Sequence, residues 1–291
     1  MYLEHFGLKE LPFTLTPNTA FLVNLPTHVE CLNLLLFAIR SGEGFIKIIG
    51  EVGTGKTLVC RKLLNLLHRG GLGVAYIPNP FLAPDDLYRA VAQELHVDVS
   101  TASSSHEVLN IINYHLIENA KQGKKTVLLI DEAQSMPAES IEALRLLSNL
   151  ETETNKLIQI VLFGQPELDE LLDQKALRQL KQRITSSYHI NKLSPDHTER
   201  YISHRVNVAG RNGESLFNKQ SIKAIYHGTG GVPRLINVVC NKSLQAAFGK
   251  GDRQVTRAHV SRALKDTEGT KKMSRIYRDR IFNMFAALKF G

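Results

Sequence analysis

The residues best suited to chemistry stand in one short stretch near position 50 of the 291-residue chain. The stretch matches G-x-x-x-x-G-K-[ST] and reads Gly50-Glu51-Val52-Gly53-Thr54-Gly55-Lys56-Thr57. In this pattern the glycines let backbone N–H groups surround phosphate oxygens, where a side chain would clash. We expect Lys56 to reach the β- and γ-phosphates of ATP and the Thr57 hydroxyl to ligate Mg²⁺.

The segments on either side of this stretch are those that a phosphate-binding loop requires. The apolar run Phe45–Ile49 precedes it, and a helical pattern begins at Leu58 and ends at Gly70-Gly71. A helix N-terminus carries a partial positive charge, so Leu58 is counted with the nucleotide-binding residues. The order of strand, loop and helix disfavours the alternative, which is a plain glycine turn.

Two adjacent carboxylates follow another apolar run and complete the predicted site. Val127–Ile130 leads directly into Asp131 and Glu132. Ligands of open α/β sheets bind at the carboxyl ends of the strands, so we assign Asp131 to Mg²⁺, through water. Glu132 points elsewhere and is expected to polarise the attacking water as a general base. The alternative, an acidic turn at a strand end, is disfavoured by the pairing with the loop.

The arrangement of the remaining elements predicts an α/β nucleotide-binding fold. Short apolar runs alternate with helical patterns over the first two-thirds of the chain, which favours a parallel sheet covered on both faces. The expected strands are Phe45–Ile49, Val74–Pro78, Val127–Ile130 and Ile158–Phe163. Capping-box spacings, which begin at Thr27 and at Ser104, predict the starts of two of the helices.

From Ser194 onward the sequence indicates helices only. Ser194 as N-cap with Pro195 at the first helical position is a strong start signal. The expected helices are Pro195–Ala209, Lys219–His227, Pro233–Phe248 and Arg257–Asp266. The predicted organisation is therefore an N-terminal segment, an α/β P-loop domain, an all-helical lid and a basic tail, over residues 1–26, 27–192, 193–268 and 269–291.

The charge of the chain is unevenly distributed. The net charge is +8, but residues 1–190 hold 17 Lys/Arg and 21 Asp/Glu, whereas residues 191–291 hold 19 and 7. The second part therefore carries +12 against −4 for the first. Such a surface favours anionic polymers or lipids as partners, and the alternative is that it only keeps the protein in solution.

Several functional classes are disfavoured by the sequence. Cys31, Cys60 and Cys240 lie far apart in apolar helical contexts, so we expect buried, reduced thiols. The scattered histidines offer no metal-ligand spacing. No apolar run reaches the roughly 18 residues that a membrane helix needs, and the N-terminus does not resemble a secretory signal. We therefore expect a cytoplasmic protein, which leaves room for peripheral attachment to the inner membrane.

Beyond these motifs, the sequence resembles the ExeA/GspA family of secretion and pilus ATPases. Gly50–Thr57 and Leu128–Glu132 resemble the Walker A and Walker B motifs of AAA+ ATPases. Further similar segments extend over about residues 1–266, and within the family the chain looks closest to short members associated with type IV pili of the mannose-sensitive haemagglutinin kind. These segments are Phe6–Leu8, Pro12-Phe13, Thr16-Pro17, Asp131–Gln134, Phe163–Leu168, Leu177–Leu180, Gln182–Ile184 and Gly230–Asn237.

The resemblance implies roles for residues that spacing alone does not reveal. Gln165 would sense the γ-phosphate, and Arg234 would be the second sensor, at the start of a lid helix. Arg178 or Arg183 would be an arginine finger that reaches the γ-phosphate of a neighbouring subunit, which implies a ring or filament. The alternatives are a polar turn for Gln165, a surface arginine for Arg234 and structural ion pairing for the other two.

The two ends of the chain carry further expectations. Tyr2, Phe6, Leu8 and Phe13 are expected to form a packed plug rather than an adenine pocket. Residues 269–291 hold six basic residues against the single Asp279, and Tyr277, Ile281, Met284, Phe285 and Leu288 recur at helical spacing. This tail is expected to lie on an anionic membrane or a partner, and the alternative is that it packs on the lid.

The leading hypothesis is an ATPase that couples hydrolysis to the assembly or positioning of an envelope machine, such as a type IV pilus or a secretion apparatus. The second is a DNA-binding transposition helper, which the basic second part permits. The third is a nucleotide-dependent scaffold with little turnover, which Glu132 argues against.

Overall fold

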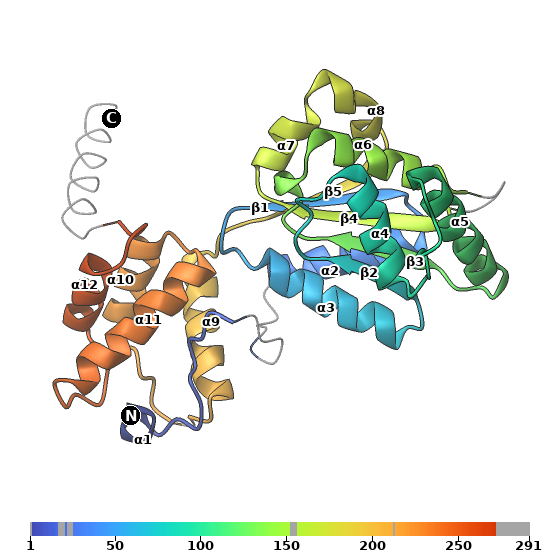
Figure 1. The fold of residues 1–291 in the computed structure, drawn as a ribbon. Helices are drawn as coiled ribbons and strands as arrows, with labels where there is room; N and C mark the ends of the chain where they lie inside the picture. Colours follow the sequence, from blue (N-terminus) through green and yellow to red (C-terminus); the bar gives the residue numbers. More distant parts are fainter. Residues whose placement is uncertain (1, 17–20, 22–25, 152–155, 212, 272–291) are drawn as a thin grey trace. The chain divides into compact units, whose positions relative to one another are not determined.

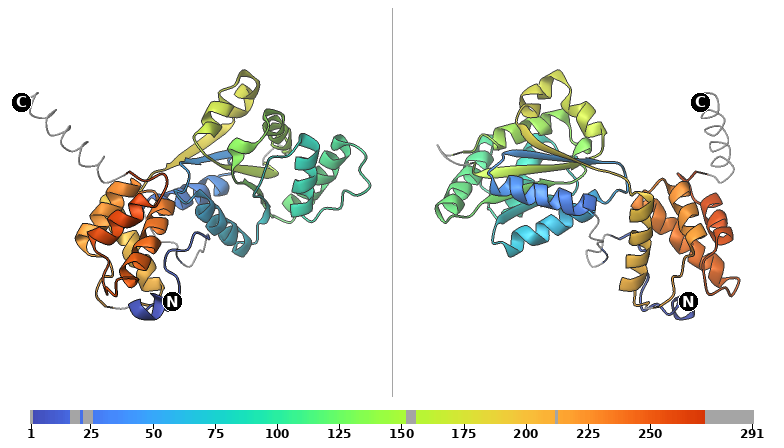
Figure 2. Two further views of the ribbon diagram at one scale, coloured as in Figure 1. Left: turned by 60° about the vertical axis from the view of Figure 1, so that its left-hand side comes forward. Right: turned by 180° about the vertical axis from the view of Figure 1, so that it is seen from behind.

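The structure is a computed structural model that describes residues 2–16, 21, 26–151, 156–211 and 213–271. The chain divides into two compact units, each considered by itself (Figures 1 and 2). The sheet unit comprises Pro26–Val52 and Lys56–Asn191, and the helical unit comprises Met1–Leu25, Gly53–Gly55 and Lys192–Gly291. Residues 272–291 of the tail, with the apolar stripe at 277–288, lie outside the described residues.

The sheet unit is built on a five-stranded parallel sheet in the order β2-β3-β4-β1-β5. The strands are β1 (Phe45–Gly50), β2 (Gly73–Ile77), β3 (Thr126–Ile130), β4 (Ile158–Gly164) and β5 (Ile184–Ile190). The predicted fold class and the four predicted strands are confirmed, with bounds that differ by about one residue.

The prediction missed the fifth strand. β5 pairs with β1 alone, at the edge of the sheet, and its side chains alternate between partly buried and exposed positions. Polar residues such as Ser186 and Ser187 therefore occupy it, and the strand lacks the continuous apolar run that marks a strand buried on both faces.

Helices cover both faces of the sheet (Figure 1). They are α2 (Pro26–Arg40), α3 (Lys56–Arg69), α4 (Pro84–Glu94), α5 (Ser105–Lys121), α6 (Ala138–Leu147), α7 (Glu167–Leu172) and α8 (Arg178–Lys181). Because successive strand residues point to opposite faces, β3 contributes Leu128 and Ile130 to one core and Val127 and Leu129 to the other.

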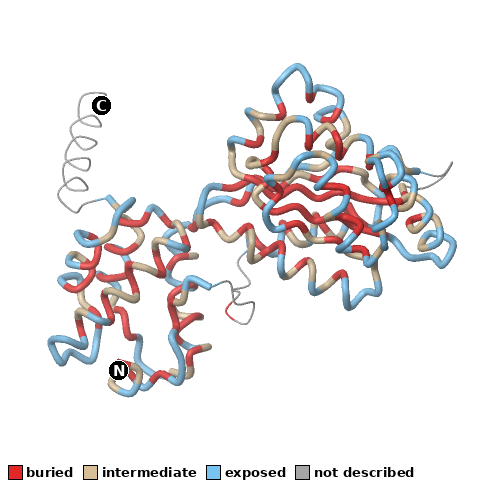
Figure 3. Tube along the Cα trace, viewed as in Figure 1, coloured by how far each residue is buried: buried red, intermediate tan, exposed pale blue. Residues whose placement is uncertain are grey.

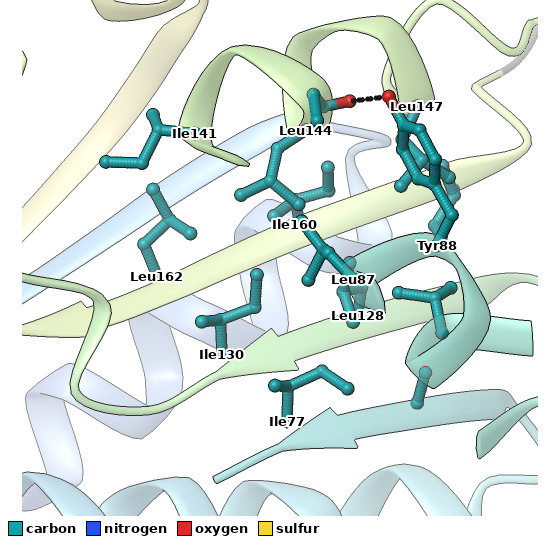
Figure 4. Close-up of a cluster of buried hydrophobic side chains, with 14 of the residues drawn as sticks. Ile77, Leu87, Tyr88, Leu128, Ile130, Ile141, Leu144, Leu147, Ile160 and Leu162 are labelled. Atoms are coloured by element: carbon teal, nitrogen blue, oxygen red, sulfur yellow. Dashed lines mark hydrogen bonds between the residues drawn. The ribbon is translucent and has the colours of Figure 1, made fainter. Parts of the chain in front are cut away.

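The first core includes α4, α5 and α6 (Figure 4). There the hydroxyl of Tyr88 donates a hydrogen bond to the backbone carbonyl of Ala143 over 3.2 Å. The second core includes side chains of α2 and α3. In the trace coloured by burial, the strands appear as a buried layer (Figure 3). The burial of β3 in this layer fixes the position of its carboxyl end, and therefore the position of Asp131, which follows it directly.

The predicted helix starts had different outcomes. Ser104 caps α5, because its Oγ accepts the backbone N–H of Glu107 at 3.3 Å. The carboxylate of Glu107 accepts a hydrogen bond from the backbone N–H of Ser103 rather than from that of Ser104. The prediction for Thr27 is wrong: α2 begins at Pro26, and the Oγ1 of Thr27 is buried without a hydrogen-bond partner among the described residues. Proline at a first helical position supplies the start signal instead.

The helical unit contains the predicted helices after residue 194. They are α9 (Pro195–Val208), α10 (Lys219–Thr229), α11 (Pro233–Phe248) and α12 (Arg257–Lys265), preceded in the chain by the short α1 (Tyr2–Phe6). Ser194 caps α9, because its Oγ accepts the N–H of His197 at 3.2 Å. Tyr2, Phe6, Leu8 and Phe13 pack into the core of this unit, which confirms the predicted plug.

A buried arginine fixes the N-terminal segment within the helical unit. Arg205 is 5% exposed and donates hydrogen bonds to the carbonyl of Pro12 and to the hydroxyl of Tyr201. Its guanidinium also lies 4.9 Å from the centre of the Phe21 ring. Neutral acceptors and aromatic faces thus compensate its burial. Across both units, no helix among the described residues is long and apolar enough to span a membrane.

Candidate nucleotide-binding site

The phosphate-binding loop connects β1 to α3. Gly53 and Gly55 adopt φ angles of 80° and 101°, which lie in the region that favours glycine and lets successive N–H groups converge. Lys56 opens α3 and is buried, with Nζ donating to the carbonyl oxygens of Gly50 at 2.7 Å and Glu51 at 3.2 Å. The ammonium group is therefore held against the loop.

Lys56 is a partly desolvated cation, which suits the binding of an anion. Burial lowers the pKa of Lys56, and the charges of Glu132 and Asp131 oppose this effect. An ammonium that has lost much of its hydration interacts more strongly with a phosphate than one in bulk water does. The loop glycines, the helix N-terminus and this buried cation fit a nucleoside triphosphate.

The structure brings Thr57 and Asp131 together, although 73 residues separate them in the sequence. Asp131 is 3% exposed at the end of β3, and its carboxylate is hydrogen-bonded to the side chain of Thr57 and to the backbone N–H of Glu132, the latter over 3.0 Å. Burial raises the pKa of Asp131, and these hydrogen bonds oppose the rise. A hydroxyl beside a carboxylate is a donor set that suits Mg²⁺.

Glu132 has a constrained backbone. Its φ of 51° is left-handed, which is uncommon for a residue other than glycine and is found at functional sites. Its carbonyl accepts the backbone N–H of Ser135 at 2.9 Å and the Ser135 hydroxyl at 2.8 Å, which closes the 3-10 turn η2 (Ala133–Ser135). The turn sends the side chain of Glu132 in a different direction from that of Asp131.

Two glutamine amides hold the carboxylate of Glu132. Gln134 Nε2 lies 2.7 Å and Gln165 Nε2 lies 3.0 Å from the same oxygen, Oε2. Burial alone raises the pKa of Glu132, but these hydrogen bonds and the charge of Lys56 bring the pKa below its ordinary value. Glu132 is therefore an ionised carboxylate at neutral pH, the form that a general base requires.

No role is predicted for Gln134 from the sequence, although the run Asp131–Gln134 is one of the segments that resemble the ExeA/GspA family. The only available signal was its position two residues after Glu132, where a tight turn brings the two side chains to one side. In a continuing strand or a regular helix, the side chains of Glu132 and Gln134 would point in other directions relative to each other. Their contact therefore depends on the 3-10 turn.

The arginines predicted for the site lie in different surroundings. Arg178 starts α8 and is exposed, whereas Arg183 donates hydrogen bonds to the hydroxyl of Ser148, at 3.1 Å, and to the Asn149 side chain. Arg234 stands in the first turn of α11, in the helical unit, and is exposed. Within each unit these positions are compatible with a function toward another subunit or ligand, and none of the three is buried.

Two comparisons of the sequence with known proteins find relatives. Residues 39–172 match a family model described as an AAA domain. The chain is 40% identical over 271 residues to general secretion pathway protein A of Aeromonas hydrophila, an alignment that covers 93% of this chain and 49% of that protein. The chain thus spans about half the length of this relative.

Solved structures support the fold. The chain resembles the ORC2 protein of Aeropyrum pernix in complexes with ADPNP and ADP (TM-score 0.63, 16% identity, 90% of this chain and 74% of that chain). It also resembles Cdc6p of Pyrobaculum aerophilum (TM-score 0.65, 19% identity, 85% and 70%). A further match is the RuvB branch-migration motor of Thermotoga maritima (TM-score 0.55, 14% identity, 84% and 69%). At these identities the likeness concerns the fold alone, and it confirms the predicted fold class.

Proposed function

We propose that the chain belongs to the family of general secretion pathway protein A, to which it is 40% identical, and that it is a Mg²⁺-dependent ATPase that converts ATP and water to ADP and phosphate. The observation that carries this proposal is the convergence of Lys56, Thr57, Asp131 and Glu132 at one edge of the sheet. The first three provide for binding, and the fourth is the group that hydrolysis needs in addition.

In this proposal the loop residues Gly50–Thr57 and Leu58 hold the phosphates through backbone N–H groups and Lys56. Thr57 and Asp131 hold Mg²⁺, which supplies charge neutralisation on the phosphate oxygens. Glu132, ionised and fixed by two amides, accepts the proton of the attacking water. Gln165 reaches the γ-phosphate from the end of β4, as its place beside Glu132 allows.

Self-association supplies the last charge that the transition state needs. We assign this role to Arg178 or Arg183, each as an arginine finger toward a neighbouring subunit in a ring or filament. Arg178 is exposed, and Arg183 donates hydrogen bonds to the neutral side chains of Ser148 and Asn149, while its charge also acts on the carboxylate of Glu151. Arg234 would make the helical unit respond to the bound nucleotide.

The partner is proposed from the relative's name and from the charge distribution. The name of the relative, general secretion pathway protein A, supports an envelope secretion or pilus machine as the system that this chain serves. This agrees with the resemblance of the sequence to short pilus-associated members. Such a protein would work in the cytoplasm and, through its basic second part, at the inner surface of the inner membrane. The transposition-helper alternative rests on the same basic charge, and duplex binding distinguishes it.

Two substitutions test the proposed reaction. Lys56→Ala removes the buried cation and is expected to abolish useful ATP affinity. Glu132→Gln keeps the size of the side chain and is expected to retain binding while turnover falls by about 10²–10⁴-fold. Affinity is measured with a fluorescent ATP analogue and turnover by phosphate release. Lys62→Ala on α3 and Glu139→Gln on α6 are matched controls. Near-normal turnover of Glu132→Gln would remove Glu132 as the base.

A further inference from the structure

The side-chain amide of Gln134 bridges two residues of the site. Its Nε2 donates to Glu132 Oε2 at 2.7 Å, and its Oε1 accepts the backbone N–H of Gln165 at 3.0 Å. A backbone N–H can only donate a hydrogen bond, so the oxygen of the amide must face Gln165 and the nitrogen must face Glu132. The bridge therefore has one chemically sensible orientation.

Both amides bind the same carboxylate oxygen. Gln134 and Gln165 donate to Oε2 of Glu132, and an oxygen of an ionised carboxylate has two lone-pair directions. Two donors on the same oxygen restrict the rotation of the carboxylate. Oε1 is then the oxygen whose lone pairs neither amide uses, and its direction is set by the pair of glutamines.

The backbone around the bridge is equally constrained. Gln134 lies in the turn η2, where the backbone and hydroxyl of Ser135 both bind the carbonyl of Glu132. Glu132 is held in a left-handed conformation that persists only when its surroundings enforce it. The amide of Gln134 therefore extends from a fixed base, and a shorter or differently shaped side chain could not make both bonds.

We propose that Gln134 is a positioning residue that aims the free oxygen of Glu132 at the attacking water and keeps Gln165 in register with it. This inference rests on the proposed ATPase function and adds to it a residue that acts through Glu132. An oriented base contributes more than a mobile one, because misplacement by about an ångström has a large effect on rate. Gln134 itself contacts no phosphate in this scheme.

The first test separates turnover from binding. Gln134→Met keeps the length of the side chain and removes both hydrogen bonds, and it is expected to lower kcat by about tenfold, part of the ~10²–10⁴-fold that a general base contributes. Gln134→Glu keeps the acceptor for Gln165 but replaces the donor with a negative charge beside Glu132, so a larger loss is expected. Affinity for ATP should stay within about twofold, because the phosphate-binding residues are intact. Gln93→Met, at an exposed position of α4, is the matched control.

The second test follows the contact without turnover. The side-chain NH₂ signal of Gln134 is identified by its absence from the ¹H–¹⁵N spectrum of Gln134→Met, and this signal should shift in Glu132→Ala. In a separate kinetic test, adding Gln134→Met to Glu132→Gln should not lower the single-turnover rate further. A normal kcat in Gln134→Met would overturn the inference. So would a Gln134→Met substitution that lowers the single-turnover rate as much in the Glu132→Gln background as in the wild type. A wild-type protein that binds ATP without hydrolysing it would instead refute the proposed function, and the NMR shift would still report the bridge.

Discussion

Gln165 donates a hydrogen bond from its side-chain amide to the carboxylate of Glu132, over 3.0 Å and between the ends of two neighbouring parallel strands. The residue proposed to sense the γ-phosphate thus touches the residue proposed to activate water. Any bond that Gln165 makes to a phosphate oxygen through the same N–H must replace its bond to Glu132. In the proposed scheme, sensing and activation thus involve the same side-chain amide.

This coupling predicts the behaviour of Gln165→Ala. We expect turnover to fall by about tenfold or more, because Glu132 loses a donor and the phosphate loses a contact, while ATP affinity changes little. Steady-state hydrolysis and binding of a fluorescent ATP analogue measure the two effects. Gln174→Ala, at an exposed position before the 3-10 turn η3 (Lys175–Leu177), is the control. A variant that loses affinity and turnover in equal proportion would instead indicate that Gln165 contributes to uniform binding.

The parts of the proposed site that the sequence predicts depend on local rules. Gly50–Thr57 and Asp131 follow buried strands, and the carboxyl ends of the strands in a parallel sheet lie on the same side of the sheet. The contact between Gln134 and Glu132 depends on one left-handed residue and a tight turn, and nothing in the residue types required that backbone. Geometry of this kind becomes visible only in three dimensions.

The fold shows the same division. Four strands were predictable because each is an apolar run: β1, β3 and β4 lie inside the sheet, and β2 is apolar although it lies at an edge. The edge strand β5 and the start of α2 were not, because an edge position tolerates polar residues and because Pro26 rather than Thr27 begins the helix. Most helices and strands were thus predictable from the sequence, and their exact bounds needed the structure.

A second prediction concerns self-association. In the Glu132→Gln background, which should retain bound ATP, we expect the mass measured by light scattering to rise when ATP is added. Arg178→Ala and Arg183→Ala form a matched pair, and the one that supplies the finger should lose turnover by about 10³-fold or more while it keeps ATP affinity. A strict monomer at high protein concentration would refute the finger in both positions.

A third prediction concerns the thiols. Cys31, Cys60 and Cys240 are all buried, and burial raises the pKa of Cys31 to about 12 and the pKa values of the other two well above their ordinary value. The folded protein should resist alkylation by iodoacetamide at pH 8, because the reactive thiolate is almost absent. Labelling of all three should appear in denaturant, measured by mass spectrometry.

The same thiols give a pH dependence of stability. The unfolded chain ionises its thiols near pH 9.0, whereas the folded protein retains the Cys31 proton up to about pH 12. The folded state binds more protons in this window, so the free energy of unfolding should fall as pH rises through it. Urea titrations of the wild type and of Cys31→Ala measure the difference. Rapid labelling of a thiol in the native protein would contradict both expectations.

The last prediction concerns the basic tail, which is judged from sequence because residues 272–291 lie outside the described part of the chain. A truncated chain should end at Lys271, since Thr270 and Lys271 hydrogen-bond to Leu264 and Gly228 in the helical unit. The removed segment holds five basic residues and one acidic residue, a net +4. Basic residues near an anionic surface contribute about 1 kcal/mol each at low ionic strength, so the full chain should sediment with phosphatidylserine vesicles more than the truncated chain does.

Salt and lipid composition separate this outcome from its alternatives. Binding should weaken as salt rises and should be lower on neutral phosphatidylcholine vesicles, because the attraction is screened within about 10 Å at 0.1 M ionic strength. Equal sedimentation of the two chains would show that the tail is not a membrane anchor and would favour its packing on the helical unit. Strong binding to duplex DNA that is lost with the tail would move support to the transposition-helper function, since contacts with phosphates are made by the same Lys and Arg side chains.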